Sequence, residues 1–101
     1  MNDFGRFADP ALLIMISLAG GDKHGYAMME DIKTFSGVKI GPGTLYGALA
    51  RLEERGWIAA LDSDERRRPY RLLPAGTPAL HEQLASWHSI SVEGLKRLGM
   101  A

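Results

Sequence analysis

The sequence predicts a mostly helical α+β fold, in which three helices precede a two-stranded β-hairpin and one long helix follows it. Three observations lead to this prediction. Apolar residues recur at helical spacing in four segments, two short β-like runs flank a polar turn, and glycine or proline marks most boundaries. At 101 residues, the chain suits one domain with a single modest core.

The first helix is predicted to begin at Asp9, which can cap it, with Pro10 at its first helical position. Residues 11–19 are apolar nearly all round, so this helix should be buried on most faces, and Gly20-Gly21 ends it. The run is far shorter than the roughly 20 residues that a membrane span needs. Acidic residues precede it and no cleavage motif follows, so we expect neither a membrane segment nor a signal peptide.

Two further helices are predicted on the same grounds. Apolar residues at helical spacing indicate a second helix over about residues 24–35, which Ser36-Gly37 ends. The third helix opens at Gly41-Pro42-Gly43 and stops at Gly56. Its apolar residues form one stripe, which consists of Leu45, Ala48, Leu49 and Leu52.

A hairpin and a last helix complete the predicted fold. Residues 57–61 and 70–73 are β-like runs separated by a charged turn. A helix over about residues 77–98 carries apolar residues at a spacing close to a heptad: Leu80, Leu84, Trp87, Leu95 and Leu98. A single terminal helix has little of its own domain to pack against, so this stripe favours a homodimer. The alternative is that the helix folds back onto its own core.

This order of elements is the layout of a winged helix-turn-helix, in which the third helix can lie in the major groove of DNA beside a wing formed by the hairpin. The outer face of the third helix carries the small residues Gly47 and Ala50, which let its backbone approach closely. Arg51 can reach a guanine edge or a phosphate, and Thr44 with the free amides near Gly43 suits a phosphate. The alternative is an ordinary amphipathic helix whose outer face meets solvent.

The predicted wing carries an arginine cluster beside Tyr70, which consists of Arg66, Arg67, Arg68 and Arg71. Arginine suits phosphate because its planar guanidinium presents a fork of donors. Acidic residues in the same turn partly neutralise the cluster, and the alternative is a solvated charged face. The formal net charge of the chain is +0, which counts against nucleic-acid binding unless the positive residues gather on one surface.

Several short strings stand out: Gly41-Pro42-Gly43-Thr44-Leu45-Tyr46, Arg51-Leu52-Glu53 followed by Gly56-Trp57-Ile58, His24-Gly25-Tyr26, and Tyr70-Arg71-Leu72. In combination they resemble the PadR family of transcriptional regulators, over roughly residues 9–80. The resemblance implies a dimeric winged-helix protein, usually a repressor, that binds a near-palindromic operator. It also implies dimerisation through the C-terminal helix, often with help from the first helix, and in many relatives a response to a small molecule. This chain has only one helix after the wing, which argues against a large effector domain.

The candidate site residues combine both lines of argument, because the resemblance places Pro42, Gly43, Thr44, Tyr46 and Arg51 on the DNA side. The full predicted DNA-binding set is Lys39, Pro42, Gly43, Thr44, Tyr46, Gly47, Arg51, Arg66, Arg67, Arg68 and Tyr70. The predicted dimer interface consists of Leu12, Ile16, Leu80, Leu84, Trp87, Leu95 and Leu98. Trp87 is also a candidate to stack on a planar aromatic effector, the alternative being that it only packs in the interface.

We therefore divide the chain into an N-terminal segment (residues 1–8), a winged-helix DNA-binding domain (9–74) and a C-terminal dimerisation helix (75–101). The expected partners are double-stranded DNA, a second copy of the chain and a small-molecule effector. We expect no cofactor, because the glycines around residue 43 lack the spacing and the βαβ context of a dinucleotide loop. We expect no metal ion either, because His81 and His88 lie about 10 Å apart along their helix.

The sequence contains no cysteine, which excludes disulfides and thiolate nucleophiles and fits a reducing cytoplasm. No cluster of titratable groups converges in the predicted fold, so we do not expect an enzyme. Winged helices also serve as protein-docking domains, and an interaction module without DNA binding is the alternative to a transcriptional regulator. The arginine wing and the small outer face of the third helix favour DNA.

Overall fold

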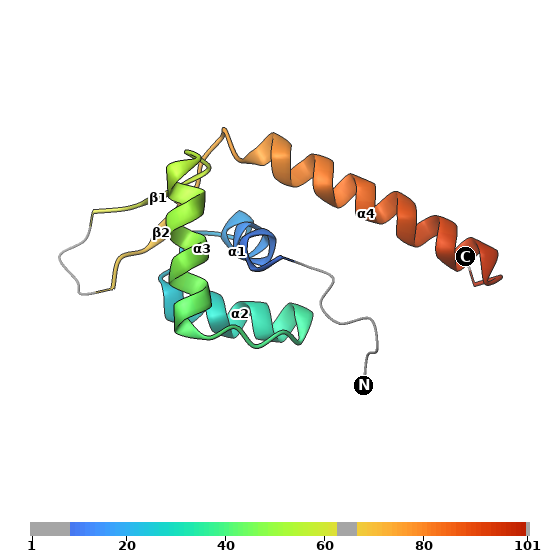
Figure 1. The fold of residues 1–101 in the computed structure, drawn as a ribbon, viewed down its shortest axis with the longest axis horizontal. Coiled ribbons are helices and arrows are strands. Elements are labelled where there is room, and N and C mark those ends of the chain that lie inside the picture. Colours follow the sequence, from blue (N-terminus) through green and yellow to red (C-terminus); the bar gives the residue numbers. More distant parts are fainter. Residues whose placement is uncertain (1–8, 63–66, 101) are drawn as a thin grey trace.

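A computed structural model describes residues 9–62 and 67–100. The helices and strands follow the predicted order: α1 (Pro10–Ala19), α2 (Gly25–Ser36), α3 (Pro42–Glu54), β1 (Ile58–Ala60), β2 (Tyr70–Leu72) and α4 (Thr77–Arg97). Figure 1 shows α1 in the middle of the molecule, with α2 and α3 beside it and α4 leading away. The predicted fold of three helices, a β-hairpin and a long last helix is therefore confirmed.

The first two helices begin where the sequence provides a cap. The carboxylate of Asp9 accepts a hydrogen bond from the backbone N–H of Ala11 at 2.8 Å. α2 begins one residue later than predicted because His24 is its cap, and Nδ1 of this imidazole accepts a hydrogen bond from the N–H of Ala27 at 3.3 Å. α2 ends at Gly37, whose φ of 75° is a left-handed conformation that favours glycine.

One hydrophobic core lies between the helices and the hairpin. Its buried members are Leu13, Ile14, Met15 and Leu18 of α1, Met28 and Ile32 of α2, Ile40, Leu45, Ala48, Leu49 and Leu52 in and before α3, Ile58 of β1, and Leu80 of α4. The predicted apolar stripe of α3 is thus its buried face. Because the core occupies this face, the opposite face of α3 is left to solvent or to a partner.

The hairpin is antiparallel, with Ile58 opposite Leu72 and Ala60 opposite Tyr70, and its strands are one or two residues shorter than predicted. Lys23 extends it on one side: the N–H of Tyr70 donates to the carbonyl of Lys23 at 2.9 Å, and the N–H of Lys23 donates back at 3.3 Å. The segment between α1 and α2 is therefore attached to the wing. A single bridging residue leaves no alternating pattern that could have predicted this.

A small polar cluster joins α1 to α2. Ser17 is only 1% exposed, and its hydroxyl donates to the carboxylate of Asp31 at 2.7 Å. The ammonium group of Lys23 donates to the backbone carbonyl of Ser17 and lies 3.8 Å from the Asp31 carboxylate. The one polar residue in the apolar run of α1 is buried and therefore has a hydrogen-bond partner, as the cost of an unsatisfied hydroxyl requires.

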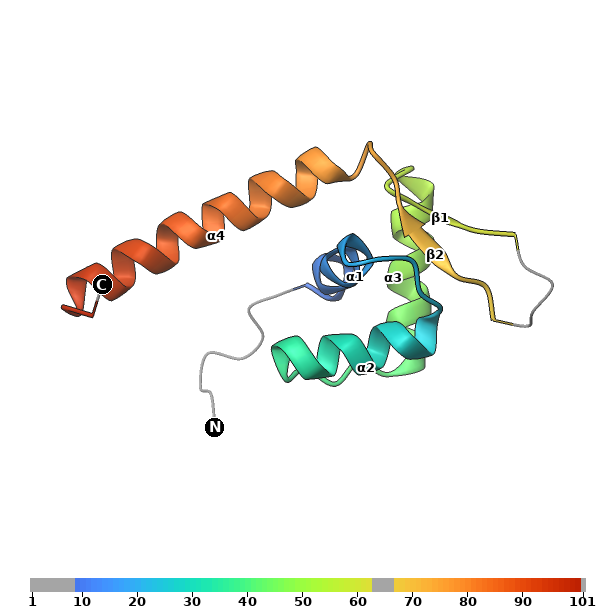
Figure 2. The ribbon, with the colours of Figure 1, turned by 180° about the vertical axis from the view of Figure 1, so that it is seen from behind.

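α4 leaves the body of the molecule as an arm (Figures 1 and 2). Only Leu80 of this helix is buried, and Leu98 at its end is 74% exposed. The alternative in which the last helix folds back onto its own core is therefore not what the structure shows.

In the part of the chain that the structure describes, no helix has the length and apolar character to cross a membrane.

Candidate nucleic-acid interface

The outer face of α3 is open along its whole length. Its exposed residues are Pro42, Gly43, Thr44, Tyr46, Gly47, Ala50 and Arg51, with the acidic Glu53 and Glu54 exposed at the C-terminal end, and Lys39 is exposed in the link before the helix. The N-cap residue is Gly41, and no side chain caps the first amides of the helix. These N–H groups therefore remain available to a phosphate oxygen, which the positive end of the helix dipole also favours.

The two flanks of α3 face different neighbours. Tyr46 lies on the flank toward the hairpin, where it lines a cleft together with Tyr70. Arg51 lies on the opposite flank and lines a second cleft, at the base of α4. A guanidinium nitrogen of Arg51 is 3.8 Å from the position that a Cβ on Gly47 would take, so this side chain lies along the exposed helix surface. The structure thus separates two residues that the sequence analysis grouped together.

The arginines of the hairpin have different surroundings. Arg67 and Arg68 are exposed, and Arg66 lies outside the described residues. Arg71 instead forms a two-pronged ion pair with Asp22, with Nη2 2.7 Å from Oδ2 and Nε 3.2 Å from Oδ1. These hydrogen bonds hold the pKa of Asp22 below its ordinary value and raise the pKa of Arg71. Arg71 therefore ties β2 to the segment before α2 and is not part of the free arginine cluster that we predicted.

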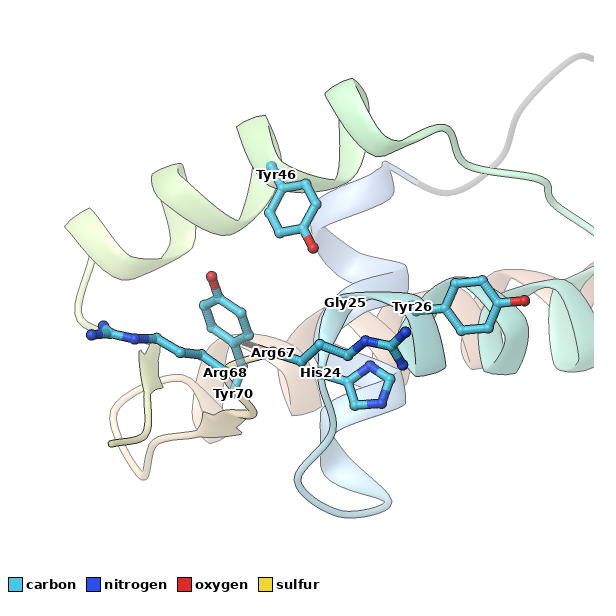
Figure 3. A pocket seen from close by; sticks show the side chains of 7 residues that line it. All are labelled: His24, Gly25, Tyr26, Tyr46, Arg67, Arg68 and Tyr70. Atoms are coloured by element: carbon cyan, nitrogen blue, oxygen red, sulfur yellow. The ribbon is translucent and has the colours of Figure 1, made fainter. Parts of the chain in front are cut away.

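A cleft of about 310 Å³ lies where the hairpin, α3 and the start of α2 meet, and it is lined by His24, Gly25, Tyr26, Tyr46, Arg67, Arg68 and Tyr70. Figure 3 shows the hydroxyl of Tyr70 pointing toward α3 and that of Tyr46 pointing toward the start of α2, while Arg68 points away. The guanidinium of Arg67 lies 6.0 Å from the centre of the Tyr26 ring, a cation–π distance. Burial raises the pKa of Tyr70, so its hydroxyl stays a neutral donor.

His24 and Tyr26 also belong to this site, although neither is among the site residues predicted from the sequence. A Cβ built on Gly25 would lie 2.7 Å from the hydroxyl oxygen of Tyr46 and 3.0 Å from a methyl carbon of Leu45. Glycine at this position therefore lets α2 approach α3 and brings His24 and Tyr26 to the cleft. The string His24-Gly25-Tyr26 was the available signal, but it served only to establish the resemblance.

A larger cleft, of about 680 Å³, lies between α1, the end of α3 and the first half of α4. The chain has two tryptophans, Trp57 and Trp87, and both line this cleft together with Leu12 of α1. The guanidinium of Arg55 lies 5.1 Å from the centre of the Trp57 ring. The candidate effector residue Trp87 is thus beside Leu12, one of the predicted interface residues.

The remaining predicted interface residues lie along α1 and α4. Leu84, Leu95 and Leu98 are exposed, Ile16 is half-buried, and Leu80 is buried in the core of its own chain. Leu80 therefore anchors the base of α4, and the apolar surface available to a partner lies beyond it.

A three-helix body, an exposed outer face on α3 and an arginine-bearing hairpin beside it define a winged-helix protein. Within this class, the chain belongs to the PadR-like family of transcriptional regulators, whose sequence profile matches residues 13–82. The family identified from the sequence motifs is therefore confirmed. Its members are transcriptional regulators and not enzymes, which agrees with the prediction for this chain.

Individual relatives agree with this assignment. Transcriptional regulator Rv3488 of Mycobacterium tuberculosis is 33% identical over 98 residues, which cover 94% of this chain and 90% of that protein. An uncharacterized 37.1 kDa protein in transposon TN4556 of Streptomyces fradiae is 42% identical over 85% of this chain, which spans only 25% of that relative's length. The solved structure of a transcriptional regulator from Clostridium thermocellum matches with a TM-score of 0.78 at 27% identity, covering 95% of this chain and 96% of that one.

Proposed function

We propose that this protein binds a specific, near-palindromic DNA operator as a homodimer and represses transcription from it in the cytoplasm. One observation carries this proposal: the open outer face of α3 and the arginines of the hairpin adjoin the same cleft, so one partner can meet both. Membership of a family of transcriptional regulators makes duplex DNA the partner that fits this surface.

In the proposed complex, α3 lies in the major groove, which is about 12 Å wide and admits a helix. The small residues Gly47 and Ala50 allow the helix backbone to approach the base edges. The free amides near Gly43 and the hydroxyl of Thr44 take a phosphate at the helix start. Arg66, Arg67 and Arg68 on the wing reach the neighbouring backbone, and the full DNA-side set is the one that the sequence predicts.

The homodimer forms through α4. The arm carries exposed Leu84, Leu95 and Leu98 on one stripe, and apolar side chains spaced in this way pack against a second helix. Trp87 and Leu12 lie at the inner end of the same surface. A two-fold axis through this interface sets two copies of α3 about one DNA turn, or roughly 34 Å, apart.

The proposal is tested by titrating the protein against fluorescent duplex DNA from its own promoter at several salt concentrations. A random duplex serves as the control for sequence specificity. If the dimer neutralises about six phosphates, the logarithm of affinity falls with the logarithm of salt concentration with a slope of about −5. Raising the salt from 50 to 200 mM then weakens binding by about 10³-fold.

A variant with Arg66→Ala, Arg67→Ala and Arg68→Ala tests the wing in the same titration. We expect weaker binding and a flatter salt dependence, because three cations per protomer no longer displace counterions. Reporter transcription that rises when the gene is deleted establishes repression, whereas a fall indicates an activator. Failure of the wild-type protein to bind any duplex at low salt overturns the proposal and favours a protein-interaction module.

We also propose that the cleft at the base of α4 is the effector site, with Trp87 as the stacking residue. Both tryptophans of the chain line this cleft, so tryptophan fluorescence reports on it specifically. A planar aromatic effector should quench this fluorescence and change the affinity for the operator. A Trp87→Leu variant should lose the response. No quenching across a panel of planar aromatic molecules would contradict the assignment.

A further inference from the structure

The cleft between the wing, α3 and α2 has a chemistry of its own. Its lining contains two cationic side chains, Arg67 and Arg68, and no carboxylate among the described residues. Outside the lining, the charge of Glu53 adds to the effect of burial in raising the pKa of Tyr70. Such a lining favours an anion, and three tyrosines and a histidine supply further polar groups around it.

Two hydroxyl groups in this cleft are available to a ligand. The hydroxyls of Tyr46 and Tyr70 have no hydrogen-bond partner among the described residues. The Tyr70 ring packs against the hydrophobic core, and the half-exposed Tyr46 side chain lies against Gly25 of α2. Figure 3 shows the Tyr70 hydroxyl directed toward α3 and the Tyr46 hydroxyl directed toward the start of α2, where it adjoins Gly25. Each hydroxyl can donate to a phosphate oxygen, and hydrogen bonds to a charged acceptor are the stronger kind.

His24 adds a donor whose orientation is fixed by the fold. Its Nδ1 accepts the hydrogen bond from the N–H of Ala27 at 3.3 Å. In the neutral ring the other nitrogen, Nε2, then carries the proton and is a donor. His24 also lines the cleft, with the guanidinium of Arg67 drawn beside its ring in Figure 3. The cap of α2 thus sets which nitrogen of His24 can meet a ligand.

Tyr26 holds the charged group of the cleft. The centre of its ring lies 6.0 Å from the guanidinium carbon of Arg67. Its own hydroxyl points away from the other side chains in Figure 3. An arginine on a hairpin loses side-chain entropy when it is fixed in one place. The Tyr26 ring reduces that loss at the moment of binding by holding Arg67 beforehand.

We propose that this cleft seats a single backbone phosphate of the operator, bound by Arg67, by the hydroxyls of Tyr46 and Tyr70, and by Nε2–H of His24. The inference rests on the proposed function and extends it, because it makes the start of α2 a third DNA-contacting element beside α3 and the wing. We expect the ligand of this cleft to be a phosphodiester group of duplex DNA, since α3 brings the duplex to the same surface.

The test uses the full-length protein and operator duplexes in which one phosphate at a time is replaced by an uncharged methylphosphonate. For the wild type, replacing the seated phosphate should weaken binding by about ten-fold or more. For Arg67→Ala, the same replacement should cost little more, because the charged contact is already lost. For Tyr46→Phe, it should cost less than in the wild type, because one of the four contacts is gone, but more than in Arg67→Ala. Arg67→Ala should also reduce the salt slope by about 2 for the two protomers, whereas Tyr46→Phe should leave the slope unchanged.

Two further variants separate folding from binding. His24→Asn keeps a side chain that caps α2 well but is too short to reach the cleft. This variant should bind the operator with the same affinity as Tyr46→Phe, and its melting temperature should equal that of the wild type. Lys96→Ala in the last turn of α4 changes the net charge as Arg67→Ala does, far from the cleft, and should leave the methylphosphonate pattern unchanged.

The outcomes distinguish a failure of the proposed phosphate-binding cleft from a failure of the proposed function. If the wild type binds its operator but every phosphate replacement costs the same in the wild type and in all cleft variants, the phosphate seat is wrong and DNA binding stands. If inorganic phosphate shifts the His24 ring signals in an NMR titration while the variants leave DNA binding unchanged, the cleft takes free phosphate and the DNA assignment is overturned. If the wild type binds no duplex at low salt, the proposed function itself falls.

Discussion

Gly76 and Gly94 show how differently two residues of one type can be constrained. Gly76 precedes α4, and a Cβ built there would lie 2.8 Å from the carbonyl oxygen of Trp57 and 2.9 Å from its Cβ. These atoms belong to the backbone or lie next to it and cannot move aside. A Cβ on Gly94, within α4, would meet nothing within 4 Å. Gly76 therefore permits the close approach that directs α4 away from the hairpin.

The first prediction concerns this pair. Gly76→Ala should destabilise the protein by about 1–3 kcal/mol, because it overpacks a tight contact. Gly94→Ala should stabilise α4 by up to about 1 kcal/mol, because alanine is the better helix former. Urea denaturation followed by circular dichroism measures both. Equal effects of the two substitutions would contradict the assignment of a steric role to Gly76.

The Asp22–Arg71 ion pair predicts a pH dependence. Because these hydrogen bonds lower the pKa of Asp22 in the folded state from its ordinary value of 3.8, its contribution to stability is complete above that value. The contribution is lost as the pH falls through the lower folded pKa. The difference in unfolding free energy between the wild type and Asp22→Asn should therefore be constant from pH 7 to 5 and shrink toward zero in stronger acid. A difference that persists unchanged into strong acid would contradict this role of the ion pair.

At the scale of elements, α1 and α2 are joined by a polar contact inside an otherwise apolar packing. The sequence of α1 is apolar nearly all round and predicts a buried helix, and its one polar residue, Ser17, could not be paired from the sequence. The structure places it against Asp31, and Lys23 completes the cluster. Lys23 also pairs with β2, so this cluster connects both helices to the wing.

Ser17→Ala should lower the free energy of unfolding by about 1.5–3 kcal/mol, since it removes a buried hydrogen bond to a charged group. Ser89→Ala, on the exposed surface of α4, is the matched control and should change stability little. Thermal or urea unfolding measures the difference. An unchanged stability for Ser17→Ala would mean that water replaces the hydroxyl without cost.

α4 carries the prediction about assembly. Leu95→Lys should raise the dimer dissociation constant by about 30-fold or more, because it puts a charge in the apolar stripe. The protomer should stay folded, since this side chain is 44% exposed within it. Ser89→Lys adds the same charge on the opposite side of the helix and should leave the dimer intact. Sedimentation velocity over a concentration series measures both, and a dimer unaffected by Leu95→Lys would place the interface elsewhere.

At the scale of the whole molecule, the positions of the charged side chains matter more for DNA binding than the net charge of the chain. Lys and Arg together number 12, as do Asp and Glu, so the formal net charge is +0. Attraction to DNA must therefore come from where the charges lie. The cleft beside α3 has arginines and no carboxylate among the described residues that line it. A neutral chain can in this way carry one locally positive surface.

Dimer geometry predicts the spacing of the operator. Two α3 helices held about one DNA turn apart read two half-sites on the same face of the duplex. Inserting five base pairs between the half-sites turns one of them to the opposite face, so affinity should fall by about 100-fold or more, toward that of a single half-site. The same insertion outside the palindrome is the control. Fluorescence anisotropy measures both, and equal affinities would contradict a rigid two-fold complex.

The sequence alone was sufficient for every helix, the hairpin, the buried stripe of α3 and the family. These features depend on local periodicity, on caps such as Asp9 and on motif strings, all of which lie within a few neighbouring residues. It also predicted the outer residues of α3 as the candidate DNA-side face, because residues opposite a buried stripe must be exposed. Those residues are exposed in the structure, and their contact with DNA remains a prediction.

The tertiary structure decided which side chains meet across long separations. Arg71 and Asp22 are 49 positions apart, and the sequence could not show that Arg71 is paired with a carboxylate while Arg67 lies beside the ring of Tyr26. The approach of α2 to α3 at Gly25 brings His24 and Tyr26 to the wing, and the tight contact at Gly76 sends α4 outward as an arm. Periodicity describes one element at a time, whereas these contacts depend on how the elements pack, and packing is set by the shapes of side chains that are distant in sequence.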